Sequence, residues 1–167
     1  MTSGLAYIGL GSNLEDPIAQ VKRAREAIAA LEGVSERGFS SLYRTAPLGP
    51  QNQPDYINAV MAVATERSPH DLLGALQAIE LAHGRVRGKE RWGPRVLDLD
   101  LLLYGRFCIR SLALILPHPG LAERPFVLYP LAEIAPPSLL IPGRGTLKEL
   151  LQRCPWKGLE RLEVSDG

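Results

Sequence analysis

The chain has 167 residues, of which 46% are hydrophobic and 22% charged, and its formal net charge at pH 7 is +1. This length predicts one domain, spanning residues 1–167, with a single hydrophobic core. A net charge so close to zero excludes a strong global field, so we expect no nucleic-acid partner and no membrane partner.

The cysteines and the N-terminal stretch indicate a cytoplasmic protein. Cys108 and Cys154 lie far apart and form neither a C-x-x-C pair nor a zinc pattern, which is typical of reduced thiols. No segment reaches the roughly 20 apolar residues of a membrane span, and the N-terminal stretch lacks the basic start of a signal peptide. We therefore expect a cytoplasmic location, and we expect the protein to be a monomer.

The hydrophobic pattern predicts an alternation of strands and helices. In chain order it gives a strand over residues 5–10, a helix from Asp16 to Gly33, strands over 35–43 and 56–65, a helix from Ser68 to Gly84, a strand over 96–104 and a short helix over 146–153. Residues 45–54, with three prolines, and the basic residues 85–95 are predicted loops. The order β-α-β-β-α-β favours a ferredoxin-like α+β sandwich, with a mainly antiparallel sheet, helices on one face and C-terminal additions.

Two aspartates stand at the start of the predicted strand over residues 96–104. Asp98 and Asp100 are expected to point to one face, about 7 Å apart, while the other face carries the leucines at 97, 99, 101 and 103. Such carboxylates are costly on a strand unless something pairs with them. One interpretation is a solvated strand face; the other is a site for one or two Mg²⁺ ions, which prefer a few carboxylates together with substrate phosphates.

A basic run lies directly before these aspartates. Residues 85–95 hold five basic residues and one acidic residue, whereas the rest of the chain has more acidic than basic residues. Guanidinium groups match phosphate oxygens, so we interpret the run as phosphate-binding, with a solvated loop as the alternative. It is not a P-loop, because the spacing is one residue short and Glu90 replaces the Ser or Thr.

Tyr56 and Asn58 are predicted to share one strand face beside the proline-rich loop. An aromatic ring and an amide can stack on and hydrogen-bond a flat heterocycle, although a core tyrosine beside a satisfied asparagine explains the pair as well. The residues alone thus indicate a phosphoryl-transfer enzyme and do not identify its acceptor. An RNA-binding module lacks support, since no strand carries base-stacking aromatics; another Mg-dependent nucleotidyltransferase stays open, and the leaving nucleotide would distinguish it.

Over residues 5–142 the chain resembles the 6-hydroxymethyl-7,8-dihydropterin pyrophosphokinase family. The matching stretches are Gly11-Ser12-Asn13-Leu14, Tyr43-Arg44-Thr45, Gln53-Pro54-Asp55-Tyr56 with Asn58, Gly84-Arg85-Val86-Arg87, Arg91-Trp92-Gly93-Pro94-Arg95 through Asp98-Leu99-Asp100, Pro117-His118-Pro119, and Arg124 with Phe126. The resemblance implies a ferredoxin-like fold and the transfer of pyrophosphate from ATP to 6-hydroxymethyl-7,8-dihydropterin in folate biosynthesis. The products would be AMP and the pterin diphosphate.

The resemblance also implies roles for individual residues. Asp98 and Asp100 would hold two Mg²⁺ ions that bridge the ATP phosphates, and Arg85 and Arg95 would be catalytic. The ATP site would be lined by Gln77, Glu80, Arg87, Leu101, His118 and Arg124. The pterin site would be formed by Thr45, Leu48, Tyr56, Asn58, Trp92 and Phe126, with Tyr56 and Phe126 as the two stacking walls.

The chain departs from the family pattern at the outer ATP contacts. Where some members carry an arginine and a threonine that contact ATP, this chain aligns Ala113 and Ile115. Where some carry a lysine after the arginine at position 87, it has Gly88, and Lys89 follows one place later. We therefore expect the outer ATP contacts to differ from those members, while the metal and pterin positions match.

Overall fold

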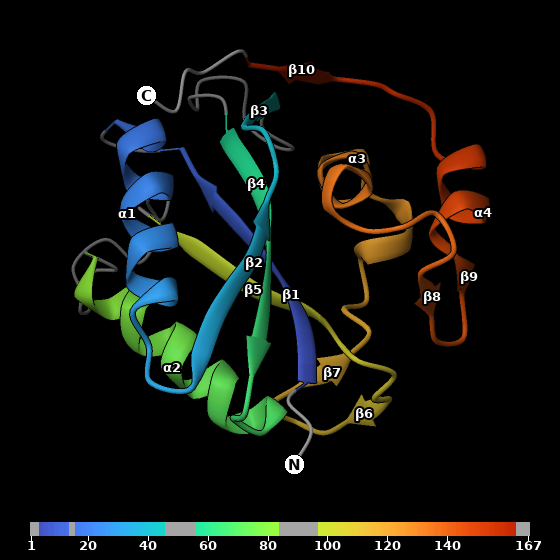
Figure 1. The fold of residues 1–167 in the computed structure, drawn as a ribbon. Coiled ribbons are helices and arrows are strands. Elements are labelled where there is room, and N and C mark those ends of the chain that lie inside the picture. Colours follow the sequence, from blue (N-terminus) through green and yellow to red (C-terminus); the bar gives the residue numbers. More distant parts are fainter. Residues whose placement is uncertain (1–3, 14–15, 46–55, 84–96, 163–167) are drawn as a thin grey trace.

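The computed structural model describes residues 4–13, 16–45, 56–83 and 97–162, which form a mixed α/β fold (Figure 1). Its main elements are β1 (Gly4–Ser12), α1 (Pro17–Ala29), β2 (Val34–Phe39), β3 (Tyr43–Thr45), β4 (Tyr56–Thr65), α2 (Pro69–Ala82), β5 (Asp98–Tyr104), α3 (Pro125–Ile134), α4 (Leu147–Gln152) and β10 (Leu159–Arg161). Shorter pieces are β6 (Ile109–Arg110), β7 (Ile115–Leu116), the 3-10 turn η1 (Leu121–Glu123), β8 (Leu140–Ile141) and β9 (Gly145–Thr146). No helix in these ranges is long and apolar enough to cross a bilayer.

The main sheet is antiparallel throughout, with the strand order β10-β3-β4-β1-β5 and with β2 also paired to β4. The predicted antiparallel sheet is thus confirmed. The prediction of one strand over residues 35–43 is wrong, because the chain breaks into β2 and β3 at Ser40. There the Ser40 hydroxyl, in place of a carbonyl, accepts the Val60 N–H at 2.9 Å, so β4 stays paired where β2 stops.

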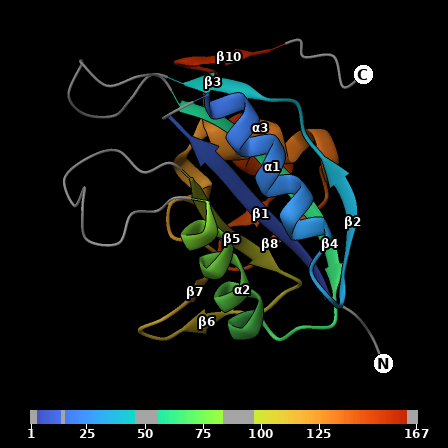
Figure 2. The same cartoon turned by 90° about the vertical axis from the view of Figure 1, so that its left-hand side faces the viewer.

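The sheet is covered on both faces. Figures 1 and 2 show α1 and α2 side by side on one face and α3 on the other. The first core packs one side of α1 and α2 against alternate residues of β1, β4 and β5. It includes Val21 and Leu76 from the helices and Ile8 and Met61 from the strands. The second core packs α3 and α4 against the opposite face, around Leu128.

Helix α3 was not predicted, because its proline content is typical of irregular chain. Pro125 fits the first turn of a helix, where a backbone N–H has no intrahelical partner. Pro130 lies inside the helix and removes one backbone hydrogen bond. Four residues of the helix, Val127, Leu128, Pro130 and Leu131, are buried against the sheet, so packing overrides the weak local preference.

The predicted helix starts are confirmed. Asp16 is the N-cap of α1 and accepts the Ala19 N–H, and Ser68 is the N-cap of α2 and accepts the Asp71 N–H at 3.1 Å. On β5 the predicted alternation holds as far as Leu101 but fails at Leu103. The register with β1 shifts between Tyr7 and Ile8, so Leu102 and Leu103 both pack into the second core.

Candidate functional site

The polar residues predicted to act together lie at one end of the sheet. Gly11 of β1 is the register partner of Asn58 on β4 and also of Asp98 on β5. Directly opposed residues of an antiparallel pair point to the same face, so Asn58 and Asp98 face the same side, two strand spacings or about 10 Å apart. A residue proposed to read a heterocycle and a residue proposed to bind metal therefore look out over one surface, the face that also carries α3.

Two glycines keep this surface open between them. Gly9 is the partner of Asp100, as Gly11 is of Asp98. A Cβ atom at Gly11 would lie 2.8 Å from Oδ1 of Asn58, closer than real side chains allow. On this face, the end of β1 between the asparagine and the aspartates thus carries no side chain, and a ligand could approach the backbone there.

A buried carboxylate of α2 is hydrogen-bonded to β5, the strand that carries Asp98 and Asp100. Glu80 of α2 is 5% exposed, and its Oε2 accepts the Leu99 N–H at 2.7 Å. Leu99 stands between Asp98, which is half-buried, and Asp100, which is exposed. Glu80, expected to line the ATP site, therefore lies beneath β5 and fixes the backbone that carries both aspartates.

His118 comes from the segment after β7 and faces the same aspartates. Its Nε2 lies 4.0 Å from Oδ1 of Asp100, and its Nδ1 accepts the Gly120 N–H at 3.1 Å. Burial lowers the pKa of His118, Asp100 opposes that shift, and Arg124 adds to it. The lowered pKa favours the neutral imidazole at pH 7, and the bond from Gly120 to Nδ1 assigns the proton to Nε2, on the side of Asp100.

Arg124 and Phe126 stand together where α3 begins. Arg124 is the N-cap residue of α3, and its guanidinium carbon lies 5.8 Å from the centre of the Phe126 ring. The helix packs on the sheet face that carries Asn58, Asp98 and Asp100. One short stretch thus brings a cation and an aromatic ring to that face.

Strand β3 completes the edge of the site nearest to Asn58. Thr45 is the register partner of Tyr56, and its hydroxyl accepts a hydrogen bond from Nδ2 of Asn58 at 2.9 Å. This bond fixes the amide orientation, with Oδ1 toward Gly11. Three residues of the expected pterin set, Thr45, Tyr56 and Asn58, are therefore brought together.

The remaining predicted residues are exposed away from this face, are buried in the core, or lie outside the described part of the chain. Gln77 is exposed on α2, and Leu101 is 2% exposed in the first core. Ala113, which precedes β7, and Ile115, the first residue of β7, are both exposed. Five site residues and one departure lie outside the described residues, so their predicted roles stay predictions: Leu48, Arg85, Arg87, Gly88, Trp92 and Arg95.

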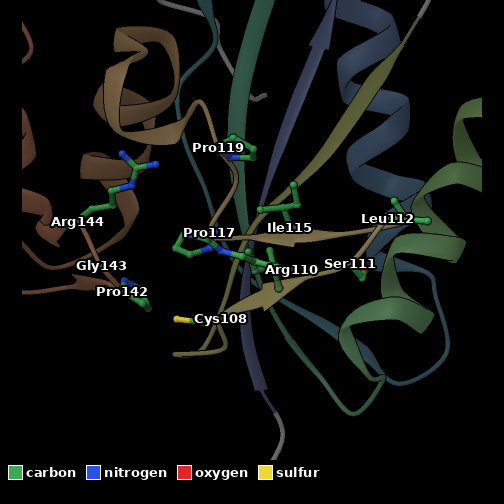
Figure 3. Close-up of a pocket in the computed structure, with 11 residues that line it drawn as sticks. Cys108, Arg110, Ser111, Leu112, Ile115, Pro117, Pro119, Pro142, Gly143 and Arg144 are labelled. Atoms are coloured by element: carbon green, nitrogen blue, oxygen red, sulfur yellow. The ribbon is translucent and has the colours of Figure 1, made fainter.

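A groove of about 860 Å³ adjoins the segment that carries His118. Figure 3 shows it between the β6–β7 hairpin and the β8–β9 turn, with Pro117 and Pro119 on its wall and Arg144 across from them. His118, which stands between the two prolines, is not among the lining residues. The groove therefore lies beside the site: none of the predicted site residues lines it, and of the two aligned departures Ala113 and Ile115 only Ile115 does.

The aspartates fit the chemistry of a hard cation. Within the described ranges, no three carboxylate, imidazole or thiol side chains converge as a closed metal cage. Mg²⁺ is usually held by one or two carboxylates, with water and substrate phosphates filling its other positions. Two aspartates on one open strand face, next to a neutral histidine, provide that donor set.

Two polar residues near the site have surroundings that the sequence did not predict. Asn13, just after β1, is 1% exposed, and neither of its amide atoms has a hydrogen-bond partner in the structure described. A buried amide left unsatisfied costs about 1–3 kcal/mol, so stability does not explain this residue. Glu133 of α3 binds the start of β3, through partners some 90 residues away in sequence. Asn13 lies in the matching stretch Gly11-Ser12-Asn13-Leu14, which gave no sign of its burial, and Glu133 has no local sequence signal.

Comparison with known proteins gives concordant results. A family model described as 7,8-dihydro-6-hydroxymethylpterin-pyrophosphokinase matches residues 7–136. A 2-amino-4-hydroxy-6-hydroxymethyldihydropteridine pyrophosphokinase of Pseudomonas aeruginosa is 49% identical over 156 residues, covering 93% of this chain and 95% of the relative. The enzyme of the same name from Haemophilus influenzae is 48% identical over 148 residues, covering 89% and 91%.

Solved structures agree in fold. A Plasmodium falciparum HPPK-DHPS crystal structure with pteroate superimposes with a TM-score of 0.71 at 13% identity over 90% of this chain. An HPPK-DHPS structure in complex with substrates gives a TM-score of 0.73 at 11% identity over 97%. The chain spans 42% and 48% of those two longer chains, respectively. At such low identity the likeness concerns the fold alone.

Proposed function

The chain belongs to the 7,8-dihydro-6-hydroxymethylpterin-pyrophosphokinase family and so transfers pyrophosphate to hydroxymethyldihydropterin in folate biosynthesis, and from that premise we propose a Mg²⁺-dependent mechanism centred on Asp98 and Asp100. The observation that carries the proposal is the shared face of Asn58, Gly11 and Asp98. It brings the acceptor side and the phosphate side of the reaction onto one open strand end.

In this proposal Asp98 and Asp100 hold two Mg²⁺ ions together with the phosphates of ATP. Mg²⁺ bound there would neutralise charge on the phosphates and template the in-line transfer. Glu80 keeps the Leu99 backbone in place, so both carboxylates stay aimed at the open face. His118 donates from Nε2 beside Asp100, and its neutral state avoids the cost of burying a second charge.

The remaining ATP contacts belong to the same proposal. Arg124 offers a guanidinium to phosphate oxygens from the start of α3, and Arg87 does so from the basic run. Gln77 contacts ATP from α2, while Leu101 and Glu80 support the site from within. Ala113 and Ile115 provide neither a charged group nor a hydroxyl, so the outer ATP contacts differ there from those of some family members.

The pterin is proposed to lie over Gly11, between the rings of Tyr56 and Phe126. Asn58 would accept from the edge of the heterocycle with Oδ1, because the bond from one N–H of Nδ2 to Thr45 holds the amide in that orientation. Leu48 and Trp92 complete the pocket. The hydroxyl of the pterin substrate attacks the β-phosphorus of ATP, the bond between the α- and β-phosphates breaks, and AMP leaves. Arg85 and Arg95 stabilise charge on the transferring group, and no nucleophilic side chain is required.

The fold class, the oligomeric state and the location complete the proposal. We propose that the core is ferredoxin-like; the strand order, with β2 and β3 counted as one broken strand and with α1 and α2 on one face, supports this. We also propose that the protein is a single-domain monomer, which sedimentation analysis tests, and that it is located in the cytoplasm.

The test is a product assay with controlled metal. Protein treated with EDTA and desalted is incubated with ATP and 6-hydroxymethyl-7,8-dihydropterin, and AMP is measured by chromatography. We expect no AMP without a divalent cation and full turnover when Mg²⁺ is restored. Turnover in the metal-free sample would disprove the metal role, and release of pyrophosphate in place of AMP would indicate nucleotidyl transfer.

A further inference from the structure

Glu133, on the last turns of α3, joins that helix to the start of β3. Its Oε1 accepts a hydrogen bond from the Ser41 N–H at 2.7 Å, and its Oε2 accepts one from the hydroxyl of Tyr43. Tyr43 is 2% exposed, and the Glu133 side chain is 22% exposed. Both carboxylate oxygens are therefore engaged by one short piece of chain, in a partly buried setting where hydrogen bonds to a charged group are strong.

The piece of chain that Glu133 holds leads directly to the acceptor side of the site. Tyr43 is the register partner of Asn58, and two residues later Thr45 accepts the hydrogen bond that orients the Asn58 amide. Strand β3 has only 3 residues, so its own ladder gives it little stiffness. Pairing with β4 on one edge and β10 on the other holds the strand, and the anchor at Ser41 and Tyr43 adds a side-chain constraint on where the Thr45 hydroxyl lies.

The same carboxylate is also tied to the other wall of the pterin site. Phe126 precedes Glu133 by seven residues on α3, two helical turns, so the two side chains project from the same side of the helix. A bond between Glu133 and β3 thus fixes the helix that carries Phe126 relative to the strand that carries Thr45. Arg161 of β10 adds an ion pair at 3.5 Å, but its side chain is 60% exposed, so this pair contributes little.

We propose that Glu133 is a positioning residue for the pterin pocket: through Ser41 and Tyr43 it fixes the helix that carries Phe126 relative to β3, whose Thr45 pairs with Tyr56. It acts through β3 and α3 and does not touch the substrate. This inference rests on the proposed pterin site. It concerns the acceptor half only, because the aspartates of the ATP half are on β5, whose anchor is Glu80.

The experiment compares four variants by calorimetric titration with the pterin substrate and, separately, with MgATP. Glu133→Ala removes both acceptors, Tyr43→Phe removes one donor, and Glu133→Gln keeps one carbonyl acceptor. Arg161→Gln is the comparison variant: it removes the exposed ion pair with Glu133 and the bond from Arg161 Nε to Ser41 Oγ at 3.1 Å, but leaves both Glu133 bonds to Ser41 and Tyr43 in place. We expect Glu133→Ala to raise the pterin Kd about tenfold, the scale of one hydrogen bond to a charged group, and Tyr43→Phe to raise it less. Glu133→Gln should recover part of the affinity, Arg161→Gln should match wild type, and the MgATP Kd should stay within about twofold throughout.

Two results would overturn the positioning role: an unchanged pterin Kd in folded Glu133→Ala, or equal losses of pterin and MgATP affinity. If Glu133→Ala does not fold, the comparison of Tyr43→Phe with Arg161→Gln decides, since Tyr43→Phe removes a single hydroxyl. Phe126→Ala is measured in parallel. If Phe126→Ala leaves pterin binding intact, the proposed pterin site itself is wrong; if it weakens binding and the Glu133 and Tyr43 variants do not, only the positioning role is wrong.

Discussion

Gly11 and Asn58 are cross-strand partners with no room for a side chain between them, because a Cβ at position 11 would lie 2.8 Å from Oδ1 of the asparagine. The amide can occupy its place over β1 only while position 11 is glycine. The other side of Gly11 is the partner of Asp98, so the same residue separates the acceptor side from the metal side.

Replacing Gly11 by alanine should therefore damage pterin binding selectively. The new methyl group displaces the Asn58 amide from its bond to Thr45, and we expect the pterin Kd to rise by about tenfold or more while the MgATP Kd changes little. Gly74→Ala on the exposed face of α2 is the matched control, since nothing lies within 4 Å of its Cβ position. That control should raise the free energy of unfolding by about 0.5–1 kcal/mol and leave pterin binding unchanged. Calorimetry on both variants checks this, and equal behaviour of the two would contradict it.

Asp98→Ala and Asp100→Ala should each abolish turnover without unfolding the protein. Removing one of two carboxylates on a shared strand face relieves repulsion in the metal-free protein, so its thermal midpoint should hold or rise. Mg²⁺ should then no longer raise the midpoint in the presence of ATP, as it should in wild type. Glu26→Ala, which removes an exposed acid of α1, controls for the change in charge. Near-normal Mg²⁺-dependent turnover in both site variants would refute the metal assignment.

Arg95→Ala should lower kcat more than it lowers MgATP affinity. A guanidinium directed at the transferring group matters most in the transition state, and loss of one such donor costs roughly 10²–10³-fold in kcat. Arg95→Lys should restore part of the rate, because a point charge cannot reproduce the planar fork. Single-turnover kinetics separate chemistry from product release. An alanine variant that keeps its single-turnover rate and loses only ATP affinity would make Arg95 a binding residue.

The stability of the protein should fall in alkaline solution partly through Tyr43. Burial raises the pKa of Tyr43 above its ordinary value, the bond to Glu133 and its negative charge raise it further, and Arg161 opposes the shift. The unfolded chain therefore loses this proton near pH 10 while the folded protein retains it, so the stabilisation is complete below pH 10 and declines as pH rises above it. Urea unfolding at pH 8 to 11 should show a steeper decline for wild type than for Tyr43→Phe. Burial also raises the pKa of Tyr7 and Tyr104. Wild type and Tyr43→Phe both retain these tyrosines, so they affect the two curves alike. Parallel curves would show that Tyr43 titrates alike in both states.

The parts of the site that follow from local pattern could be predicted from the sequence. The aspartates of β5 stand out because apolar and acidic residues alternate over a few positions, and strand geometry then assigns them to one face. Tyr56 and Asn58 follow from the same rule on β4, whose predicted bounds match the structure. In each case neighbours along the chain decide the outcome.

The parts that depend on distant chain segments could not. Gly11 follows the predicted strand over residues 5–10, and the reason for a glycine there appears only once its register with Asn58 is known. Glu133 reads as an exposed acid in a proline-rich stretch, because its partners Ser41 and Tyr43 are about 90 residues earlier. Glu80 was assigned to the ATP site by resemblance, whereas its burial and its bond to Leu99 appear only once α2 is packed against β5.

The pairing of β10 with β3 has a consequence for biosynthesis. Glu160 and Arg44 are register partners although 116 residues separate them in the chain. During translation the outer edge of β3 stays unpaired until residues 159–161 have left the ribosome, long after β1, α1 and β4 can have assembled. An open strand edge invites pairing with other chains, and contacts so distant in sequence close slowly. A nascent chain truncated before β10 should thus retain most of its core yet aggregate through the strand that borders the acceptor pocket.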